Sequence, residues 1–367
     1  MAFHTKNCVL IRYTDEDGAS SIEIPGYISQ IGEKVFENCH TLQNVVIAEG
    51  VEVIGSAAFR GCTGLQSVAL PESLRIIDGG AFSECENLQS ITIPEHVREI
   101  GGSAFEHCEK LRTVTIPAGV KEICGHTFWR CSELQSVMLP DSVTSIGSGA
   151  FLYCTNLQNL CLPRGLEYIG ERAFYYCTGL QSLTIPVNVS RIEPKTFAYC
   201  AGLKSIILPE GVISIGADAF ISCDRLQNIT WGSAVIRTDG YDKNVLSSDM
   251  MKASEMLQTK NYHLRTTNKT KYPVLFAYYQ KHPDPELKEY LKANFIRIFP
   301  FLLQNNDAIQ TEAILRIDGI IPDRELMQKT IDLAIQQTQN GGNPEIQMLL
   351  LRYQEEHFAR EPKTLRL

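Results

Sequence analysis

The strongest constraint on the fold of this chain is an internal repeat of 23 residues. Phenylalanine recurs with this period at nine positions from Phe36 to Phe220, without an insertion. Cysteine follows three residues later each time, from Cys39 to Cys223, and leucine three residues after that. A fixed period of this length is typical of a solenoid, in which each coil buries the same positions as its neighbours.

Each repeat contains three segments with different apolar patterns. Residues 65–70, LQSVAL, place apolar positions between polar ones before Pro71, which indicates a short strand. Stacked copies predict a parallel sheet with strands about 4.8 Å apart. Residues 142–147, SVTSIG, indicate a second extended segment that closes with a turn. Residues 149–154, GAFLYC, place apolar side chains at one-turn spacing and predict a short helix or 3₁₀ turn.

The pattern IPxxVxxIGxxAFxxCxxLxx resembles the BspA-type leucine-rich repeats of bacterial proteins over residues 24–231. The resemblance implies a curved α/β leucine-rich-repeat solenoid with one parallel sheet on its concave face. It also implies binding of a ligand or protein, often at bacterial surfaces, without catalytic residues. The departures from the pattern are Asp78, Cys124 and Glu193 in place of glycine, and Thr127 and Thr196 in place of alanine.

The N-terminal segment is expected to close the first end of the solenoid. Strand-like runs at 9–13 and 21–24 flank the turn signal DEDG and predict a β-hairpin cap over residues 1–24. Ile22 lies one period before Val45, so the hairpin is expected to supply the first rung of the sheet.

The remaining chain divides into three regions. The repeats fill residues 25–231, and the large ring of Trp231 is expected to cover the open end of the core. Residues 232–247 are a boundary segment, and residues 248–367 are predicted to form an all-α domain of helical hairpins.

Helix start signals mark the C-terminal domain, where a side-chain acceptor precedes proline at Asp284-Pro285 and Asn343-Pro344. Gly341-Gly342 is expected to join two helices in a short turn, and Pro300 to kink or end its own helix. A weaker repeat, offset by 35 to 36 residues, is similar to ankyrin-like helical hairpins, although no TPLHxA motif is present. The apolar stripes of the last two helices contain Met327, Ile331, Ala334, Ile346, Leu349, Leu350 and Tyr353.

Charge and hydropathy exclude some functions. A net charge of −8 and a pI of about 5.6 argue against a dedicated nucleic-acid binder. The longest apolar runs fall far short of the roughly 18 residues that a membrane helix needs. The N-terminus shows no secretory signal, so we expect a cytoplasmic protein; the alternative is a cell-surface location, if a signal peptide is missing from this sequence.

The cysteine column is the most tempting chemical signal among the twelve cysteines. The sequence contains no CxxC pair, so no structural zinc site, metal or cofactor is expected. Nine cysteines in one inward column are predicted to be reduced core thiols that act as small hydrophobes, with redox or metal use as the alternative. No Ser/His/Asp or Cys/His set can be assembled from matching repeats, so no catalytic residues are expected.

Aromatic residues distinguish one part of the outer surface. The positions before the column cysteine in consecutive repeats hold Tyr153, Tyr176 and Tyr199, with Trp129 and Tyr175 beside them. These side chains should point outward, and exposed aromatics are enriched at protein interfaces. We therefore name these five residues as the candidate binding site, with a tyrosine ladder that only stacks on itself as the alternative.

Two polar features have simpler interpretations. The column Gln43, Gln66, Gln89, Arg112, Gln135, Gln158, Gln181, Lys204 and Gln227 is expected to satisfy hydrogen bonds between repeats, or to offer a flat docking face. The stretch from Lys260 to Lys271 has four basic residues and no acid, and is expected to be a solvated loop or helix end, or else a contact with an anionic partner.

The sequence as a whole predicts a non-enzymatic scaffold that binds a protein or peptide through the solenoid. The alternatives are a cell-surface adhesion or ligand-binding protein, and an enzyme with its site in the helical domain.

Overall fold

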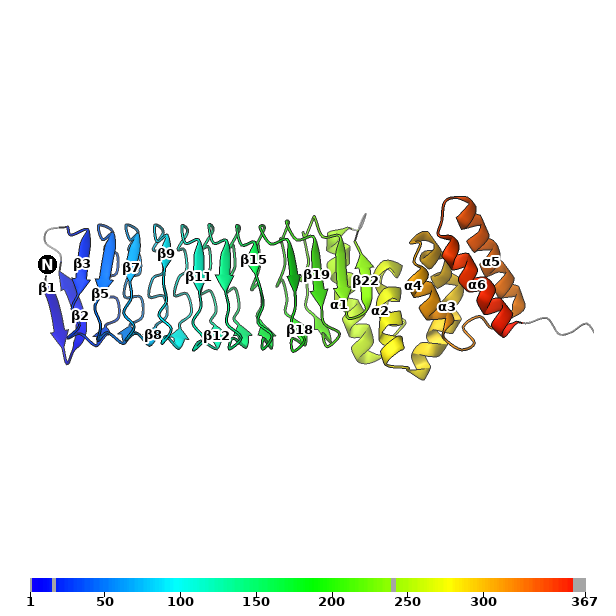
Figure 1. Ribbon diagram of the computed structural model, residues 1–367, viewed down its shortest axis with the longest axis horizontal. Helices are drawn as coiled ribbons and strands as arrows, with labels where there is room; N and C mark the ends of the chain where they lie inside the picture. Colours follow the sequence, from blue (N-terminus) through cyan, green and yellow to red (C-terminus); the bar gives the residue numbers. More distant parts are fainter. Residues whose placement is uncertain (1, 15–17, 239–241, 359–367) are drawn as a thin grey trace, which may run out of the picture. The chain divides into compact units, whose positions relative to one another are not determined.

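The computed structural model describes residues 2–14, 18–238 and 242–358. The chain separates into two compact units. The first contains Met1–Gly232 and Arg237–Met251, and the second contains Ser233–Ile236 and Lys252–Leu367. Figure 1 shows the first unit as a stack of coils in which equivalent strands of successive coils lie side by side and parallel. This arrangement confirms the predicted solenoid.

The first parallel ladder is built from the LQSVAL-type segments. Its strands pair with a step of 23 residues, as in Ile22 with Val45 and Val45 with Val68, so the predicted first rung is confirmed. Inward residues alternate with outward ones, because successive side chains of a strand point to opposite faces. The strands are β3 (Ser21–Ile24), β5 (Asn44–Ile47), β7 (Ser67–Ala69), β9 (Ser90–Ile91), β11 (Thr113–Thr115), β13 (Ser136–Met138), β15 (Asn159–Leu160), β17 (Ser182–Thr184), β19 (Ser205–Leu208) and β21 (Asn228–Trp231).

The second extended segment of each repeat forms a second, narrower parallel ladder. Glycine follows its inward isoleucine because the coils approach closely there: a Cβ on Gly147 would lie 2.5 Å from the backbone nitrogen of Gly125. The strands are β4 (Gln30–Ile31), β6 (Val53–Ile54), β8 (Ile76–Ile77), β10 (Glu99–Ile100), β12 (Glu122–Ile123), β14 (Ser145–Ile146), β16 (Tyr168–Ile169), β18 (Arg191–Ile192) and β20 (Ser214–Ile215).

The GAFLYC-type segment is a run of turns, so the predicted short helix or 3₁₀ turn is wrong in detail. Its amides alternate between two kinds of acceptor. Phe174 N donates to Thr196 O of the next coil at 3.0 Å, whereas Cys177 N donates to Phe174 O of its own coil at 3.1 Å. This turn face is therefore a third hydrogen-bonded face of the solenoid, and the inter-coil bonds replace the continuous i→i−4 bonds of a helix.

A stack of nine phenylalanine rings forms the centre of the core. The rings from Phe36 to Phe220 are fully buried, with neighbouring centroids 4.8–5.7 Å apart and planes within 10° of parallel. Coils are numbered below by these phenylalanines, from Phe36 in coil one to Phe220 in coil nine. The N-terminal end of the stack meets Tyr13, whose ring centroid is 4.9 Å from that of Phe36.

The N-terminal cap is a hairpin, but between other strands than those predicted. β1 (Ala2–Lys6) pairs antiparallel with β2 (Val9–Thr14) through a turn at Asn7 and Cys8, both with positive φ. Two consecutive left-handed residues are the signature of the type I′ turn that suits hairpins. β2 then joins the ladder of β4 and β3 joins that of β5, so the chain between them passes from one ladder to the other. In the predicted DEDG turn, residues 15–17 lie outside the described part of the chain.

The C-terminal end of the solenoid meets the first turns of helix α1 (Lys243–Thr259). Leu246 and Met250 are fully buried, and Phe220 N donates to Ser247 Oγ at 3.3 Å. Trp231 is also buried, and its Nε1 donates to Val212 O at 3.2 Å. The end of the core is therefore closed by a helix as well as by the tryptophan named from the sequence. Strand β22 (Ala234–Arg237) precedes this helix.

The second unit is helical, as predicted. Side chains of Asp284 and Asn343 accept backbone N–H groups at the starts of α3 and α6, which confirms both start signals. Pro300 lies inside α3 and does not end it, and Gly341, at φ +86°, lies in the turn between α5 and α6. Helices α3 and α4 form one hairpin and α5 and α6 the next, and the two hairpins pack together through contacts of α3 with α5 and of α4 with α6. The helices are α2 (Asn268–Lys281), α3 (Pro285–Gln304), α4 (Ala308–Leu315), α5 (Arg324–Gln339) and α6 (Pro344–His357).

Candidate interaction surface

Four of the five candidate residues come together on the turn face of coils six to eight. Tyr176 stacks on Tyr153 with centroids 5.0 Å apart and on Tyr199 with centroids 4.7 Å apart. Tyr175 packs against the side of this stack, with its centroid 5.2 Å from that of Tyr199. All four side chains are half-buried. These four residues are called the tyrosine surface.

Trp129 does not join the tyrosine surface. Its ring contacts His107 and His126 instead, at centroid distances of 5.4 and 5.3 Å. The residue that continues the stack into coil five is Arg130, whose guanidinium carbon lies 5.8 Å from the centre of the Tyr153 ring. The single aromatic strip expected from the sequence is therefore two clusters, because Leu152 lies between Trp129 and Tyr175 in their shared column and the Trp129 ring packs on histidines instead.

The backbone beneath the stacked tyrosines is left-handed. Tyr153, Tyr176 and Tyr199 have φ of 60–61°, a conformation that costs a residue with a Cβ roughly 1–2 kcal/mol. The same position is left-handed in every coil, from Asn38 to Ser222, so the coil geometry imposes it. Residue types alone do not indicate this conformation, because only Gly61 of the nine residues in the column is a glycine.

The pKa of one hydroxyl group in the tyrosine surface is shifted by its surroundings. Burial, followed by the neighbouring tyrosines, raises the pKa of Tyr175, and the charge of Arg172 opposes that increase. Arg172 is exposed and pairs with Glu171 at 3.4 Å, a surface ion pair of little strength.

The outward surface of the first parallel ladder, called the strand face, is flatter and polar. Its glutamines are exposed, and Lys204 Nζ donates to Gln181 Oε1 at 3.2 Å across one repeat. Ser67 Oγ donates to Asn44 Oδ1 at 2.8 Å in the neighbouring column. Met138 is the most exposed large apolar residue here, at 63%. Some inter-coil bonds of the expected kind are thus present on this face.

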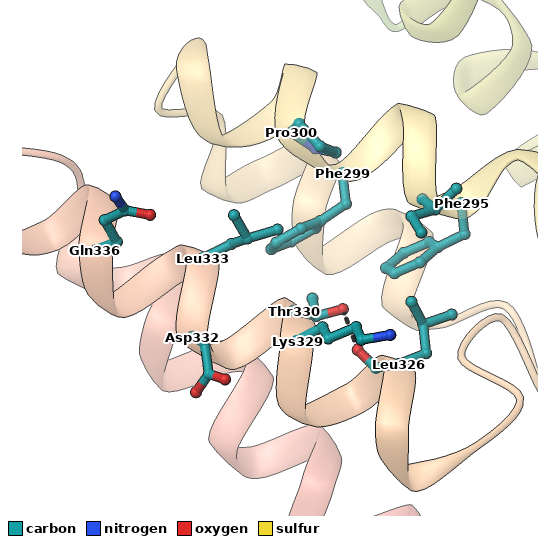
Figure 2. A pocket seen from close by; sticks show the side chains of 10 residues that line it. Phe295, Phe299, Pro300, Leu326, Lys329, Thr330, Asp332, Leu333 and Gln336 are labelled. Carbon is teal, nitrogen blue, oxygen red and sulfur yellow. Dashed lines mark hydrogen bonds between the residues drawn. The ribbon is translucent and has the colours of Figure 1, made fainter.

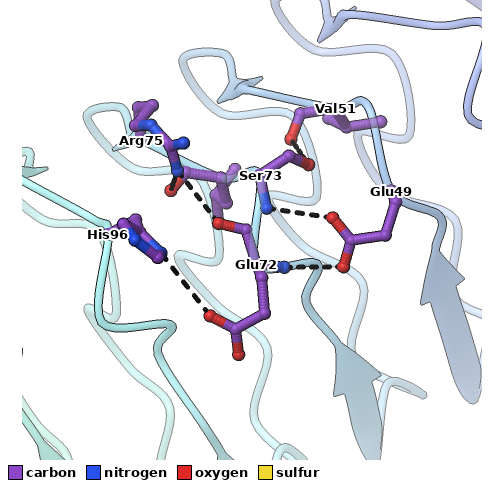
Figure 3. Close-up of polar contacts among 7 residues, drawn as sticks. Glu49, Val51, Glu72, Ser73, Arg75 and His96 are labelled. Atoms are coloured by element: carbon purple, nitrogen blue, oxygen red, sulfur yellow. Dashed lines mark hydrogen bonds and ion pairs between the residues drawn. The ribbon is translucent and has the colours of Figure 1, made fainter.

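An acidic cluster on coils two to four has a structural role. Glu49 accepts the backbone N–H groups of Glu72 and Ser73 at 2.9 and 3.1 Å (Figure 3). Ser73 Oγ donates in turn to Val51 O, and His96 lies 3.7 Å from the Glu72 carboxylate. The bonds from the backbone of Glu72 lower the pKa of Glu49. These contacts join adjacent coils.

The column cysteines are free thiols that do more than fill space. Eight are buried, whereas Cys39 is half-buried. Each buried thiol donates to the phenylalanine carbonyl of the preceding coil, as Cys131 does to Phe105 O at 3.1 Å. Burial raises the pKa of Cys62 to about 12, which keeps its thiol neutral. The other seven buried members are Cys85, Cys108, Cys131, Cys154, Cys177, Cys200 and Cys223.

The basic stretch at 260–271 is engaged within the helical unit. Lys260 Nζ lies 2.7 Å from Asp284 Oδ2. Lys271 is buried, its Nζ donating to Leu264 O and lying 4.8 Å from the centre of the Tyr290 ring. Burial lowers the pKa of Lys271. Two of the four cations therefore have partners inside the fold, which argues against a patch for an anionic partner.

The helical unit contains an apolar groove of about 350 Å³ that the sequence did not indicate. Figure 2 shows Phe295 and Phe299 of α3 pointing toward α5, with Leu333 opposite. Pro300 lies at the edge of the groove, and because proline lacks an N–H it leaves the Ile296 carbonyl without its helical donor.

Within the described ranges, no group of three or more His, Cys, Asp or Glu side chains is arranged to hold a metal ion. None of the helices in the same ranges is both long and apolar enough to cross a membrane.

Solved structures to which this chain is similar include a leucine rich cell surface protein from Faecalibacterium prausnitzii. It is 27% identical and covers 58% of this chain and 79% of its own, with a TM-score of 0.35. The leucine-rich repeat protein of T. pallidum is 25% identical over 61% of this chain and 87% of its own, with a TM-score of 0.35. Pneumococcal vaccine antigen PcpA is 24% identical over 60% and 65%, with a TM-score of 0.41. A comparison with curated proteins found no match.

A family model, described as the BspA type leucine rich repeat region, matches six copies over residues 13–135 and 125–241. The match covers more than half of the chain and coincides with the phenylalanine, cysteine and leucine columns. The chain therefore belongs to the BspA-type leucine-rich repeat family.

Proposed function

We propose that this protein is a non-enzymatic scaffold that binds a protein partner through the tyrosine surface of its solenoid. The supporting observation is that three half-buried tyrosines stack on one another in consecutive coils, each on a left-handed backbone. Tyrosine contributes heavily to protein interfaces because it supplies a large rigid surface with a polar tip.

Stacking alone is a weak reason for these tyrosines. An aromatic pair contributes about 0.5–1.5 kcal/mol. The left-handed backbone costs each tyrosine a similar roughly 1–2 kcal/mol, which glycine would avoid. The stacking contribution of a pair is therefore largely offset by the backbone cost that the glycine of coil two, Gly61, avoids.

The test is partner capture from the native cell with the full chain as bait. Tyr176→Ala with Tyr199→Ala removes two stacked rings, and alanine keeps the left-handed cost of tyrosine. The matched control is Gln158→Ala with Gln181→Ala, two exposed residues on the strand face of neighbouring coils.

The tyrosine variant is expected to lose the partner that wild type and the glutamine variant retain, because buried aromatics at interfaces commonly cost about 2 kcal/mol or more. Trp129→Ala, tested separately, should have a smaller effect because Trp129 lies in another cluster. Equal capture by the tyrosine and glutamine variants, with both folded, would rule out the tyrosine surface.

We place this activity in the cytoplasm as part of the same proposal. Eight cysteines donate a hydrogen bond from the S–H group to a backbone carbonyl, which requires the reduced form. Reduced cysteines persist in reducing compartments. The second candidate is adhesion at the cell surface, which the family resemblance implies. Protease treatment of intact cells distinguishes the two, since a surface protein is degraded and a cytoplasmic one is protected.

A further inference from the structure

The turn face changes its charge halfway along the solenoid. Counting from three residues before each core phenylalanine to two after it, coils one to four carry four acidic and two basic residues. The same positions of coils five to eight carry one acidic and three basic residues. The cations are Arg130, which lies over Tyr153, and Arg172 and Lys195, which belong to the same turn segments as Tyr175 and Tyr199. The acids of the other half include Glu84 and Glu106.

The ring faces of the tyrosine surface are already occupied. Tyr176 is covered on both faces by Tyr153 and Tyr199, whose planes lie within 24° and 11° of its own. Arg130 lies over Tyr153. A carbohydrate partner would need a free aromatic face on which its sugar ring can stack. Within this stack only the far face of Tyr199 is left for such a ring. The stack therefore presents ring edges and hydroxyl groups outward.

Edges and hydroxyls favour a partner with negative charge. The rim of an aromatic ring carries the positive part of its quadrupole, and a phenol O–H donates a hydrogen bond. Together with Arg130, Arg172 and Lys195, the surface offers donors and positive potential over four coils. An acidic segment would be repelled by the glutamates of coils one to four, which places it on coils five to eight.

We propose that the tyrosine surface recognises an acidic peptide segment of its protein partner, through the tyrosine edges and hydroxyls and the cations of Arg130, Arg172 and Lys195. The inference rests on the proposed function and specifies the chemistry of its partner.

The probe is a fluorescein-labelled decapeptide of alternating glutamate and alanine, titrated with the full chain and followed by fluorescence anisotropy. Lysine–alanine and glutamine–alanine peptides are the charge controls, and a heparin hexasaccharide represents an anionic carbohydrate. The test variant is R130E/R172E/K195E, with R130Q/R172Q/K195Q as a milder version should the reversal disturb folding. The matched control is R98E/K121E/R164E, which changes net charge equally at exposed positions of other columns.

The acidic peptide is expected to bind, with affinity falling at least about tenfold in the test variant and less than about twofold in the control. Raising NaCl from about 50 to about 300 mM should weaken binding, because surface charges are screened. Y153F/Y176F/Y199F, which keeps the stack and removes the hydroxyls, should bind several-fold more weakly.

Equal binding of the lysine peptide, equal loss in both charge variants, or binding of heparin without binding of the acidic peptide would overturn the inference. If Tyr176→Ala with Tyr199→Ala abolishes native partner capture while the charge variants leave capture and peptide binding intact, only the acidic specificity fails. If that tyrosine variant leaves capture intact, the proposed function fails as well.

Discussion

The left-handed backbone before each column cysteine is imposed by the coil, whereas the side chain placed there varies. Asn38 and Gly61 suit this conformation, and Tyr153, Tyr176 and Tyr199 do not. The cysteine column shows the opposite behaviour, because all nine positions keep the same residue. Its thiol gives both small volume and a donor toward the preceding coil, so describing it as a small hydrophobe is incomplete.

Tyr176→Gly should be more stable than Tyr176→Ala by about 1 kcal/mol, because both lose the stacked ring and only glycine escapes the left-handed cost. Urea unfolding of the two variants gives the difference directly. Equal stability of the two would show that the backbone at this position is not strained.

Thiol labelling should follow burial. Cys8 and Cys161 are exposed and should react with a thiol reagent in the native protein, with Cys39 and Cys124 slower because they are half-buried. The eight buried thiols should react only on unfolding. Rapid labelling of more than four native thiols would contradict the buried column, as would four or more disulfides in protein from its native source.

The same thiols make stability depend on pH. An unfolded thiol ionises near pH 8.5, whereas burial raises the pKa of Cys62 to about 12. The unfolded chain therefore loses its protons first as pH rises. The free energy of unfolding should be fully retained below about pH 8.5 and fall above it, by up to about 1.4 kcal/mol per thiol and pH unit. Urea unfolding between pH 7.5 and 9.5 should show a shallower fall for Cys131→Ala with Cys154→Ala, and an unchanged slope would contradict the assignment.

At the scale of elements, the two ladders of the repeats could be predicted from the sequence. The N-terminal hairpin and the capping turns of α1, which close the two ends of the solenoid, could not. The period fixes both ladders, because inward residues of one coil must meet their equivalents in the next. The turn segment misled because inward residues at three-residue spacing fit a helix and a run of turns equally well, and only the inter-coil bonds distinguish them. The true hairpin turn at Asn7 and Cys8 lacks the glycine that usually marks one.

The first turns of α1 should stabilise the solenoid. A fragment of residues 1–246 keeps every coil but loses Ser247 and Met250, whereas residues 1–259 retain both. Both fragments should fold and be rich in β-structure, since solenoid stability is a sum over neighbouring coils. The longer one should be more stable by about 2–4 kcal/mol, from one buried methionine and one hydrogen bond.

Circular dichroism melts of the two fragments test this capping role. Equal melting temperatures would show that α1 does not cap the core. An insoluble or disordered shorter fragment would show that the helix is an obligatory part of the solenoid rather than a stabilising addition.

At the scale of the whole molecule, chemistry is unevenly distributed over three faces. The glutamine column of the strand face varies little between coils, whereas the second ladder mixes polar, charged and apolar side chains and the turn face changes from acidic to aromatic and basic. The sequence identified the tyrosines because outward columns can be counted. It could not show that their rings stack, that Trp129 lies apart or that α3 and α5 enclose a groove, because these depend on side-chain directions.

Hydroxyl-radical footprinting of the full chain, with and without the partner captured from native cells, reads each face through its own side chains. Tyr168, 44% exposed on β16, reports on the second ladder, and Met138 reports on the strand face. Binding at the tyrosine surface predicts that oxidation of Tyr153, Tyr176 and Tyr199 slows severalfold while Tyr168 and Met138 react as before. Protection of Met138 or Tyr168 with unchanged oxidation of the three stacked tyrosines would contradict it.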